Sequence, residues 1–506
     1  MVMRVTNQIM QSNALQNIFN ISEDLFQANQ RVATGKRINK PSDDPMGIQE
    51  TLALRTSISQ IQQFERNIDS NRLYFGTADS SLDAIGLGIT RALELAQTGA
   101  TGTVGAETRA NLALEVQAIL DQTIQEANTQ VKGYYLFGGT ELLNPPYAAN
   151  AGGLGAVYSG NADRLEVEVA PGITAPVTRP GFEVFGTDMN PALTGTTLIA
   201  DLNGGAGITP GSFNITDRAG NVGVVNIVAG MTVNNVIAAI NGAGTNITAA
   251  INADQTGLLL TDASAVILNS MSVTEAGGTT AQSLGILSTS DSSIIGSDLN
   301  PVITATTLIA DLNGGAGLTL GQIDITNGTL TATVDLSGAA TVGDVLTALN
   351  GAGVNVTASI NSQGNAIQVV SNDPATTAVI SDVAGGNTAT LLGIGGGNIF
   401  VALDALREAM DRNDVAGILA SFANLNASQD TVLSARAEYG ALVRTMDNLE
   451  IGHGADEVSQ TAQMSAVEDS DFVKDASDVA ALQLALEATL NTTARVLQPS
   501  LLDFLR

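Results

Sequence analysis

The chain has no cysteine, no tryptophan and a single histidine, and aromatic residues make up only 4% of its 506 residues. Without cysteine there is no disulfide framework, no thiolate nucleophile and no cysteine-ligated metal. Because His453 is the only histidine, a zinc site of several histidines is excluded and a catalytic triad would have to use this residue. We therefore expect no enzyme activity, metal or cofactor, and we expect His453 to be a surface or packing residue.

Basic residues are also scarce, since 21 of them stand against 50 acidic residues and give a net charge of −29. This balance argues against nucleic acid and against an anionic membrane surface as partners, because both are bound through Lys and Arg. The chain has no apolar run approaching 18 residues, so we expect no transmembrane span. Its first residues lack the basic region and apolar core of a cleaved signal peptide, so we expect export, if it occurs, by another route.

Two apolar stripes with helical spacing lie at opposite ends of the chain. The N-terminal stripe consists of Ile18, Ile21, Leu25, Ala28 and Val32. The C-terminal stripe consists of Val479, Leu482, Leu486, Leu490, Leu497 and Leu501. A helix cannot bury such a stripe by itself, so we predict that the terminal helices pair with each other, with other copies, or with both. A closed intramolecular helix bundle with the same heptads remains an alternative.

Residues 5 to about 145 have a helical pattern with two breaks. The first is Ser42, Asp43, Asp44 and Pro45, after which we expect a new helix to begin at Pro45. This turn is either a helix cap or an intersubunit contact. The second break is rich in Gly and Thr and lies near residues 99–105. After the central region of the chain, the helical pattern returns at residue 398 and continues to the end.

Aromatic and β-type patterns follow the first helical region. The run Tyr134 to Phe137 ends in a Gly pair, and we expect it to pack the helical body against a hairpin. Residues 164–186, RLEVEVAPG and TRPGFEVFG with the link between them, alternate apolar and polar residues around Pro-Gly turns, which predicts a β-hairpin.

Residues 187–397 contain a duplication and a single aromatic residue, Phe213. TTLIADLNGGAG occurs at 196–207 and again at 306–317, and VNNVIAAINGAGTNITAAIN (233–252) returns as VGDVLTALNGAGVNVTASIN (342–361). A period of about 110 residues exceeds the ~20–50 residues of solenoid repeats, so it indicates a duplicated small domain. Each copy mixes strand patterns with one short helical segment, Val233 to Ile240 in the first and Val342 to Leu349 in the second, which leaves β and α+β folds open.

We therefore predict a multidomain protein in which both termini form an α-helical bundle or coiled coil around an inserted, duplicated β-rich region. The expected parts are N-terminal helices, a β-hairpin region, two inserted modules and C-terminal helices. Their ranges are 1–147, 148–186, 187–296, 297–397 and 398–506.

Six motifs, taken in their order along the chain, carry a resemblance to a known family. They are RVATGKRINKPSDDPMGIQETLALR (31–55), KGYYLFGGTE (132–141), VEVAPGITAPVTRPGFEVFG (167–186), ALDALREAM (402–410), LSARAEYGALVRTMDNLE (433–450) and SLLDFLR (500–506). By these motifs the chain resembles the bacterial flagellin family, and the second, third and last are similar to its subgroup at the junction of hook and filament. The duplicated insert departs from the compact members of the family.

The resemblance implies a structural part of the bacterial flagellum, outside the cell, that joins hook and filament through its terminal helices. It implies self-association in a ring, neighbouring hook-associated and filament subunits, and an export chaperone as partners. Two alternatives remain: a filament subunit, or an adhesin-like binding module in which the acidic insert stands on a helical stalk.

Overall fold

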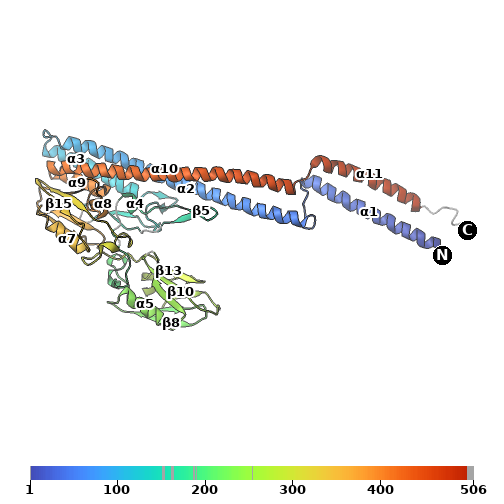
Figure 1. Cartoon of the computed structure of the whole chain (residues 1–506), viewed down its shortest axis with the longest axis horizontal. Coiled ribbons are helices and arrows are strands. Elements are labelled where there is room, and N and C mark those ends of the chain that lie inside the picture. Colours follow the sequence, from blue (N-terminus) through green and yellow to red (C-terminus); the bar gives the residue numbers. More distant parts are fainter. Residues whose placement is uncertain are drawn as a thin grey trace. The chain divides into compact units, whose positions relative to one another are not determined.

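The computed structural model describes residues 2–150, 154–160, 164–185, 189, 191–253 and 255–497. It divides into two units (Figure 1). Unit 1 contains residues 1–70, 168–173 and 445–506, and unit 2 contains residues 71–167 and 174–444. Among the described residues no helix is both long enough and apolar enough to cross a membrane.

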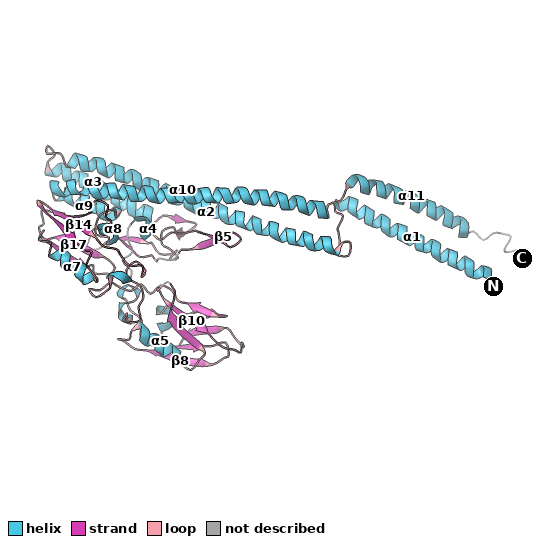
Figure 2. Cartoon of the chain, viewed as in Figure 1, coloured by secondary structure: helices cyan, strands magenta, loops and turns pink. Residues whose placement is uncertain are grey.

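Long helices form the N-terminal and C-terminal parts of the described chain, as the sequence predicted (Figure 2). They are α1 (Val2–Thr34), α2 (Pro45–Gly99), α3 (Ala106–Ala127), α9 (Ile399–Asp411), α10 (Val415–Glu468) and α11 (Phe472–Leu497). The predicted start at Pro45 and the predicted break near residues 99–105 are both confirmed.

In unit 1, α1 packs beside α11. The end of α1 contacts the start of α11 through Arg31 and Asp475, so the two helices are antiparallel. The first part of α2 and the last part of α10 are antiparallel as well, because Arg55 bonds Glu468 and Gln62 bonds Glu457. Unit 1 is thus built from two antiparallel helix pairs and the tip of a hairpin, residues 168–173.

In unit 2, the rest of α2 packs against the first part of α10, and α3 packs against α9. The rings of Phe75 and Tyr439 lie 5.9 Å apart, and Arg436 bonds the carboxylates of Asp79 and Asp83 at 2.9 and 2.6 Å. Arg109 fixes the break after α2, since its guanidinium donates to the backbone oxygen of Gly99 at 2.7 Å.

Short strands follow α3. They are β1 (Gln130–Val131), β2 (Tyr134–Tyr135), β3 (Tyr147–Ala149), β4 (Ala156–Tyr158), β5 (Glu166–Ala170) and β6 (Ile173–Pro176), followed by the helical turn α4 (Phe182–Phe185). The predicted aromatic packing is only partly present: Phe137 is buried against Phe185, with ring centroids 5.0 Å apart, but Tyr134 is exposed.

The hairpin predicted over residues 164–186 is present, because β5 pairs with β6, but the segment TRPGFEVFG does not form a strand of it. The strand β6 follows directly after the Pro171–Gly172 turn, and the segment FEVF forms α4 instead. The amide of Phe185 donates to the backbone oxygen of Gly181 at 2.8 Å. A helical turn brings Val184 and Phe185 into the core together, whereas an alternating strand would direct them to opposite faces.

Two similar modules follow, each with two antiparallel sheets and one main helix. In the first, the strand orders are β12-β11-β7-β8 and β13-β10-β9; in the second, they are β15-β14-β18 and β16-β17. The strands of the first are β7 (Gly211–Thr216), β8 (Val222–Ile227), β9 (Ile247–Ile251), β10 (Leu258–Asp262), β11 (Met271–Glu275), β12 (Thr289–Ser290) and β13 (Ser293–Ile295). The strands of the second are β14 (Gln322–Asn327), β15 (Leu330–Asp335), β16 (Val356–Ile360), β17 (Ile367–Ser371) and β18 (Ala378–Asp382).

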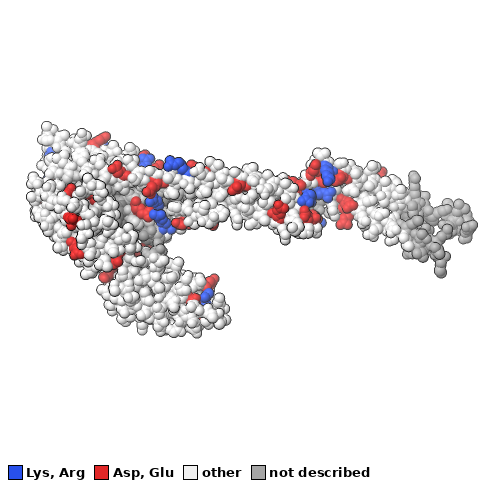
Figure 3. All heavy atoms as spheres, viewed as in Figure 1, with Lys and Arg blue, Asp and Glu red and all other residues white. Residues whose placement is uncertain are grey.

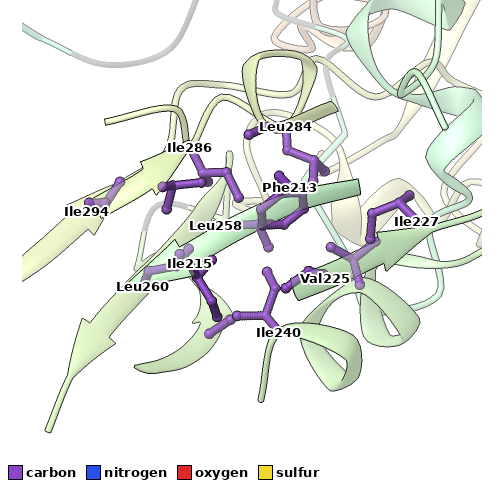
Figure 4. Packing of buried hydrophobic residues seen from close by; sticks show 14 of the residues in the cluster. Phe213, Ile215, Val225, Ile227, Ile240, Leu258, Leu260, Leu284, Ile286 and Ile294 are labelled. Carbon is purple, nitrogen blue, oxygen red and sulfur yellow. The ribbon is translucent and has the colours of Figure 1, made fainter. Parts of the chain in front are cut away.

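The helical segments predicted in each copy are α5 (Val233–Asn241) and α7 (Val342–Asn350), and both begin with a Thr capping box. Shorter helical elements are η1 (Ile199–Asp201), η2 (Asn203–Gly205), α6 (Thr280–Ser283), η3 (Ile309–Asp311) and α8 (Thr388–Leu391). Each module has its own aliphatic core; in the first, Phe213 lies among Leu258, Leu284 and Ile227 (Figure 4). The α+β alternative therefore describes both copies.

Candidate assembly interface

The predicted N-terminal stripe lies on the side of α1 that is at least partly covered. Ala28 is fully buried, and Ile18, Ile21, Leu25 and Val32 are half-buried. Of the C-terminal stripe, Val479, Leu482 and Leu486 are half-buried, whereas Leu490 is 49% exposed. Leu497 ends α11 and Leu501 follows it; the side chain of Leu497 and the whole of Leu501 lie outside the part that the structure describes. Pairing of α1 with α11 therefore covers the described residues of the two stripes only in part.

A second set of apolar side chains on the same helices is exposed. On α1, Leu15, Phe19 and Phe26 are 51%, 69% and 63% exposed, and on α11, Leu484 is 69% exposed. The steps of four and seven from Leu15 to Phe26 place the three side chains on one face of α1. Large exposed apolar side chains at helical spacing are typical of a surface that another helix covers. This face was not predicted from the sequence, although the same spacing rule finds it.

The connectors between the helices of unit 1 are joined by a charged cluster around Glu468. Its side chain is 5% exposed and accepts from Lys36 and Arg55, each at 2.5 Å. Burial raises the pKa of this carboxyl, but the hydrogen bonds from Lys36 and Arg55 outweigh burial and lower its pKa below the ordinary value. Basic and acidic side chains gather where these helices meet (Figure 3).

Backbone hydrogen bonds strengthen the same junction. The amide of Arg37 donates to the backbone oxygen of Glu468 at 2.7 Å, and the amide of Ser470 donates to that of Gly35 at 3.0 Å. Gly35 has a φ of +68°, a left-handed conformation that glycine adopts without strain and that commonly ends a helix. The connector after α1 and the connector after α10 are therefore held together by main chain as well as by charge.

The predicted turn at Ser42 to Pro45 has capping geometry. The carboxylate of Asp44 accepts from the amide of Gly47 at 2.9 Å, and that of Asp43 accepts from the amides of Asn39 and Lys40 at 3.0 and 2.8 Å. The bond from Gly47 lowers the pKa of Asp44. Ser42 and Pro45 are exposed. The turn thus caps α2, and its exposed side leaves the intersubunit role as a proposal.

His453 is a packing residue. It is buried, its ring stacks on Phe64 with centroids 5.7 Å apart, and its Nε2 lies 2.8 Å from the backbone oxygen of Val169 in the hairpin tip. Among the described residues no group of three or more His, Asp or Glu side chains could hold a metal ion. Within the described part of the chain, His453 therefore has a structural role, in which it packs on Phe64 and contacts the hairpin tip.

Comparison with known proteins relates this helical framework to flagellar proteins. Residues 5–141 match the family model described as the bacterial flagellin N-terminal helical region. This part of the chain is therefore similar to the N-terminal helical region of bacterial flagellins, in agreement with the two motifs that it contains.

Among curated relatives, flagellar hook-associated protein 3 of Salmonella typhimurium is 27% identical over 184 residues, which are 36% of this chain and 57% of that protein. The B-type flagellin of Pseudomonas aeruginosa is 30% identical over 152 residues, 30% of each chain. The chain thus spans little more than half the length of the hook-associated relatives it matches. The crystal structure of Xanthomonas campestris FlgL aligns over 81% of this chain and 98% of that one, with 15% identity and a TM-score of 0.36.

Proposed function

We propose that the chain is a structural adaptor that joins the hook to the filament of a bacterial flagellum. The observation that carries the proposal is the uncovered apolar face on paired terminal helices: Phe19, Phe26 and Leu484 are each more than 60% exposed, although α1 and α11 already pack together. Removing a side chain of this size from water is worth roughly 1.5–3 kcal/mol, so a neighbouring subunit that covers this face gains several such contributions.

The remaining parts of the proposal follow from the family resemblance. The adaptor works outside the cell, in a ring of its own copies between a hook-associated protein and the filament subunit. It reaches this place through the flagellar export apparatus with an export chaperone, and it has no enzymatic role. The exposed turn at Ser42 to Pro45 is the proposed second intersubunit contact.

Substitution of an exposed residue tests the assembly face without disturbing the α1–α11 pair. Phe19→Asp places a charge where the neighbour would pack, whereas Gln16→Asp adds the same charge at an exposed polar position one turn away. Sedimentation of each variant, alone and with the purified filament and hook-associated subunits, should show weaker association for Phe19→Asp only. If both variants associate as strongly as the wild type does, assembly through this face is refuted.

A filament subunit is the second candidate, because flagellins also occur among the matched relatives. A deletion strain separates the two functions. Loss of a junction adaptor leaves a hook and releases unpolymerised filament subunits into the medium, whereas loss of a filament subunit removes the material of the filament itself.

Deleting residues 187–397 tests the adhesin alternative, since retained motility with lost surface attachment would favour binding.

A further inference from the structure

The duplicated modules contact each other reciprocally. Module 1 is defined here as residues 193–297 and module 2 as residues 303–394, which contain the two cores apart from the lead-in residues Met189 and Leu299. Each is preceded by a similar lead-in, DMNPA at 188–192 and DLNPV at 298–302, so equivalent residues in this part of the repeat lie 110 positions apart.

Backbone hydrogen bonds give the first reciprocal pair. The amide of Ala192, in the first lead-in, donates to the backbone oxygen of Asp311 in module 2 at 2.6 Å. The amide of Val302, the equivalent of Ala192, donates to the backbone oxygen of Asp201, the equivalent of Asp311, at 2.8 Å. Each lead-in therefore bonds the other module by the same contact.

Core packing gives the second pair. Met189, in the first lead-in, is buried in the core of module 2. Its equivalent, Leu299, is buried in the core of module 1. The two lead-ins are thus exchanged, because each supplies an apolar side chain to the core that follows the other one.

Close glycine contacts give the third pair. A Cβ placed on Gly315 would lie 3.1 Å from the Cβ of Ala192, and a Cβ placed on Gly205 would lie 3.4 Å from Cγ1 of Val302. Both glycines have a positive φ, +86° and +85°. The same backbone conformation therefore receives the lead-in on each module.

A groove between the modules has the same symmetry. Every residue that lines it from the first repeat has its equivalent, 110 positions later, among the lining residues of the second. Examples are the pairs Thr197 and Thr307, Leu198 and Leu308, and Asp201 and Asp311.

We infer that each module carries a self-complementary docking face for a second module of its own kind, and that this chain fills that face internally. When residue i contacts j′ and i′ contacts j, the interface is isologous, that is, it is formed by the same patch on both partners about a two-fold axis. A head-to-tail arrangement would use two different patches and would not repeat the contact in reverse. A single module therefore binds a second copy by exchange of lead-ins, and a chain with two modules closes this contact upon itself.

The full chain tests the reciprocity directly. Because it has no cysteine, Ala192→Cys with Asp311→Cys, and separately Val302→Cys with Asp201→Cys, report only on the chosen pair. A short bifunctional thiol reagent should link both pairs within one folded chain. No link should form when the reagent is added in denaturant or to chains with a single cysteine. If only one of the two pairs links in folded protein, the reciprocal contact is refuted.

Deletion of residues 192–301 tests the docking face itself. The deletion removes one repeat length and joins Pro191 to Val302, so the junction has the same Pro-Val step as residues 301 and 302 in the intact chain. A Phe19→Asp background suppresses association through the terminal helices. We expect a Val302→Cys chain and a differently tagged Asp311→Cys chain to link to each other across two copies.

A Ser337→Cys chain in place of Asp311→Cys is the control, because Ser337 is an exposed loop residue outside the lead-in contacts. If the single-module chain keeps the strand signal of its circular dichroism spectrum but stays monomeric and unlinked, its lead-in folds back and the inference is overturned. If the single-module chain does not fold, the full-chain experiment is the test, and the inference is overturned unless both cysteine pairs link there.

Discussion

Arg31 and Asp475 lie 444 positions apart in the chain, and Nε of Arg31 donates to Oδ1 of Asp475 at 3.0 Å. The Asp475 side chain is 7% exposed and also accepts from the hydroxyl of Ser470. This ion pair joins the end of α1 to the start of α11, next to the Glu468 cluster, so it fixes the register of the two terminal helices.

Arg31→Leu should weaken this register. The substitution leaves a nearly buried carboxylate without its cation, and an unpaired buried polar group costs about 1–3 kcal/mol. We expect faster amide hydrogen exchange in the first turns of α11. Arg66→Leu, at an exposed position of α2, is the control, and equal exchange in the two variants would contradict the role of the pair.

Removal of the Glu468 carboxylate should have an effect that depends on pH. The folded-state pKa of Glu468 is lowered, so its stabilising contribution is present above the unfolded pKa and is lost as the pH falls through the folded value. Glu468→Gln should therefore destabilise the junction by about 1–3 kcal/mol at neutral pH, and this difference from wild type should shrink in acid.

The measurement is amide hydrogen exchange of the junction in wild type and variant at the same pH, which cancels the intrinsic rates. Glu94→Gln is a matched control because the Glu94 side chain is 60% exposed in its pair with Arg91. An exposed pair contributes ~0–1 kcal/mol, so we expect a small effect. A Glu468→Gln difference that stays constant from pH 7 into acid would contradict the assignment.

The packing of α1 on α11 makes a third prediction at Ala28, which has no exposed surface. Ala28→Leu adds atoms where two helices are in contact, and overpacking costs about 1–3 kcal/mol. Ala33→Leu makes the same change at an exposed position of α1. Only the first should increase protease cleavage within α1 and α11; equal cleavage would mean that the helices do not rely on this contact.

Features that depend on neighbours in sequence were predicted well. The helix that carries the stripe from Ile18 to Val32, the start at Pro45 and the helix from Val342 follow from spacing and capping rules that act within one or two turns. The duplication was recognised from the repeated sequence segments. The long terminal helices and the presence of two similar modules could therefore be predicted from the sequence without knowledge of the fold.

Features that depend on partners far along the chain were not predicted. Nothing local assigns Glu468 to Lys36 and Arg55, which are more than 400 positions away, and many acidic residues have similar surroundings in sequence. The exchanged positions of Met189 and Leu299 are likewise decided by which module each lead-in reaches. The helical turn at Val184 and Phe185 replaced a predicted strand because tertiary burial of both side chains overrides alternation.

A last prediction concerns Gly47, in the first turn of α2, where an added side chain would press on the ends of two neighbouring side chains. A Cβ there would lie 2.6 Å from Cδ1 of Ile38 and 2.7 Å from Oδ2 of Asp44, the residue that caps the helix. Ala normally stabilises a helix by about 0.5–1 kcal/mol relative to Gly. At Gly47 the clash should reverse this sign, because either the cap or the buried Ile38 must move.

Gly76→Ala is the matched substitution on the same helix, since a Cβ at Gly76 has nothing within 4 Å. Hydrogen exchange at the amides that follow each site should show less protection in Gly47→Ala and equal or greater protection in Gly76→Ala. If the turn at Ser42 to Pro45 is an intersubunit contact, as proposed above, Gly47→Ala should also weaken association with the filament and hook-associated subunits in sedimentation. Greater protection in both variants would mean that the cap tolerates a methyl group and that the close approach of Ile38 is not required.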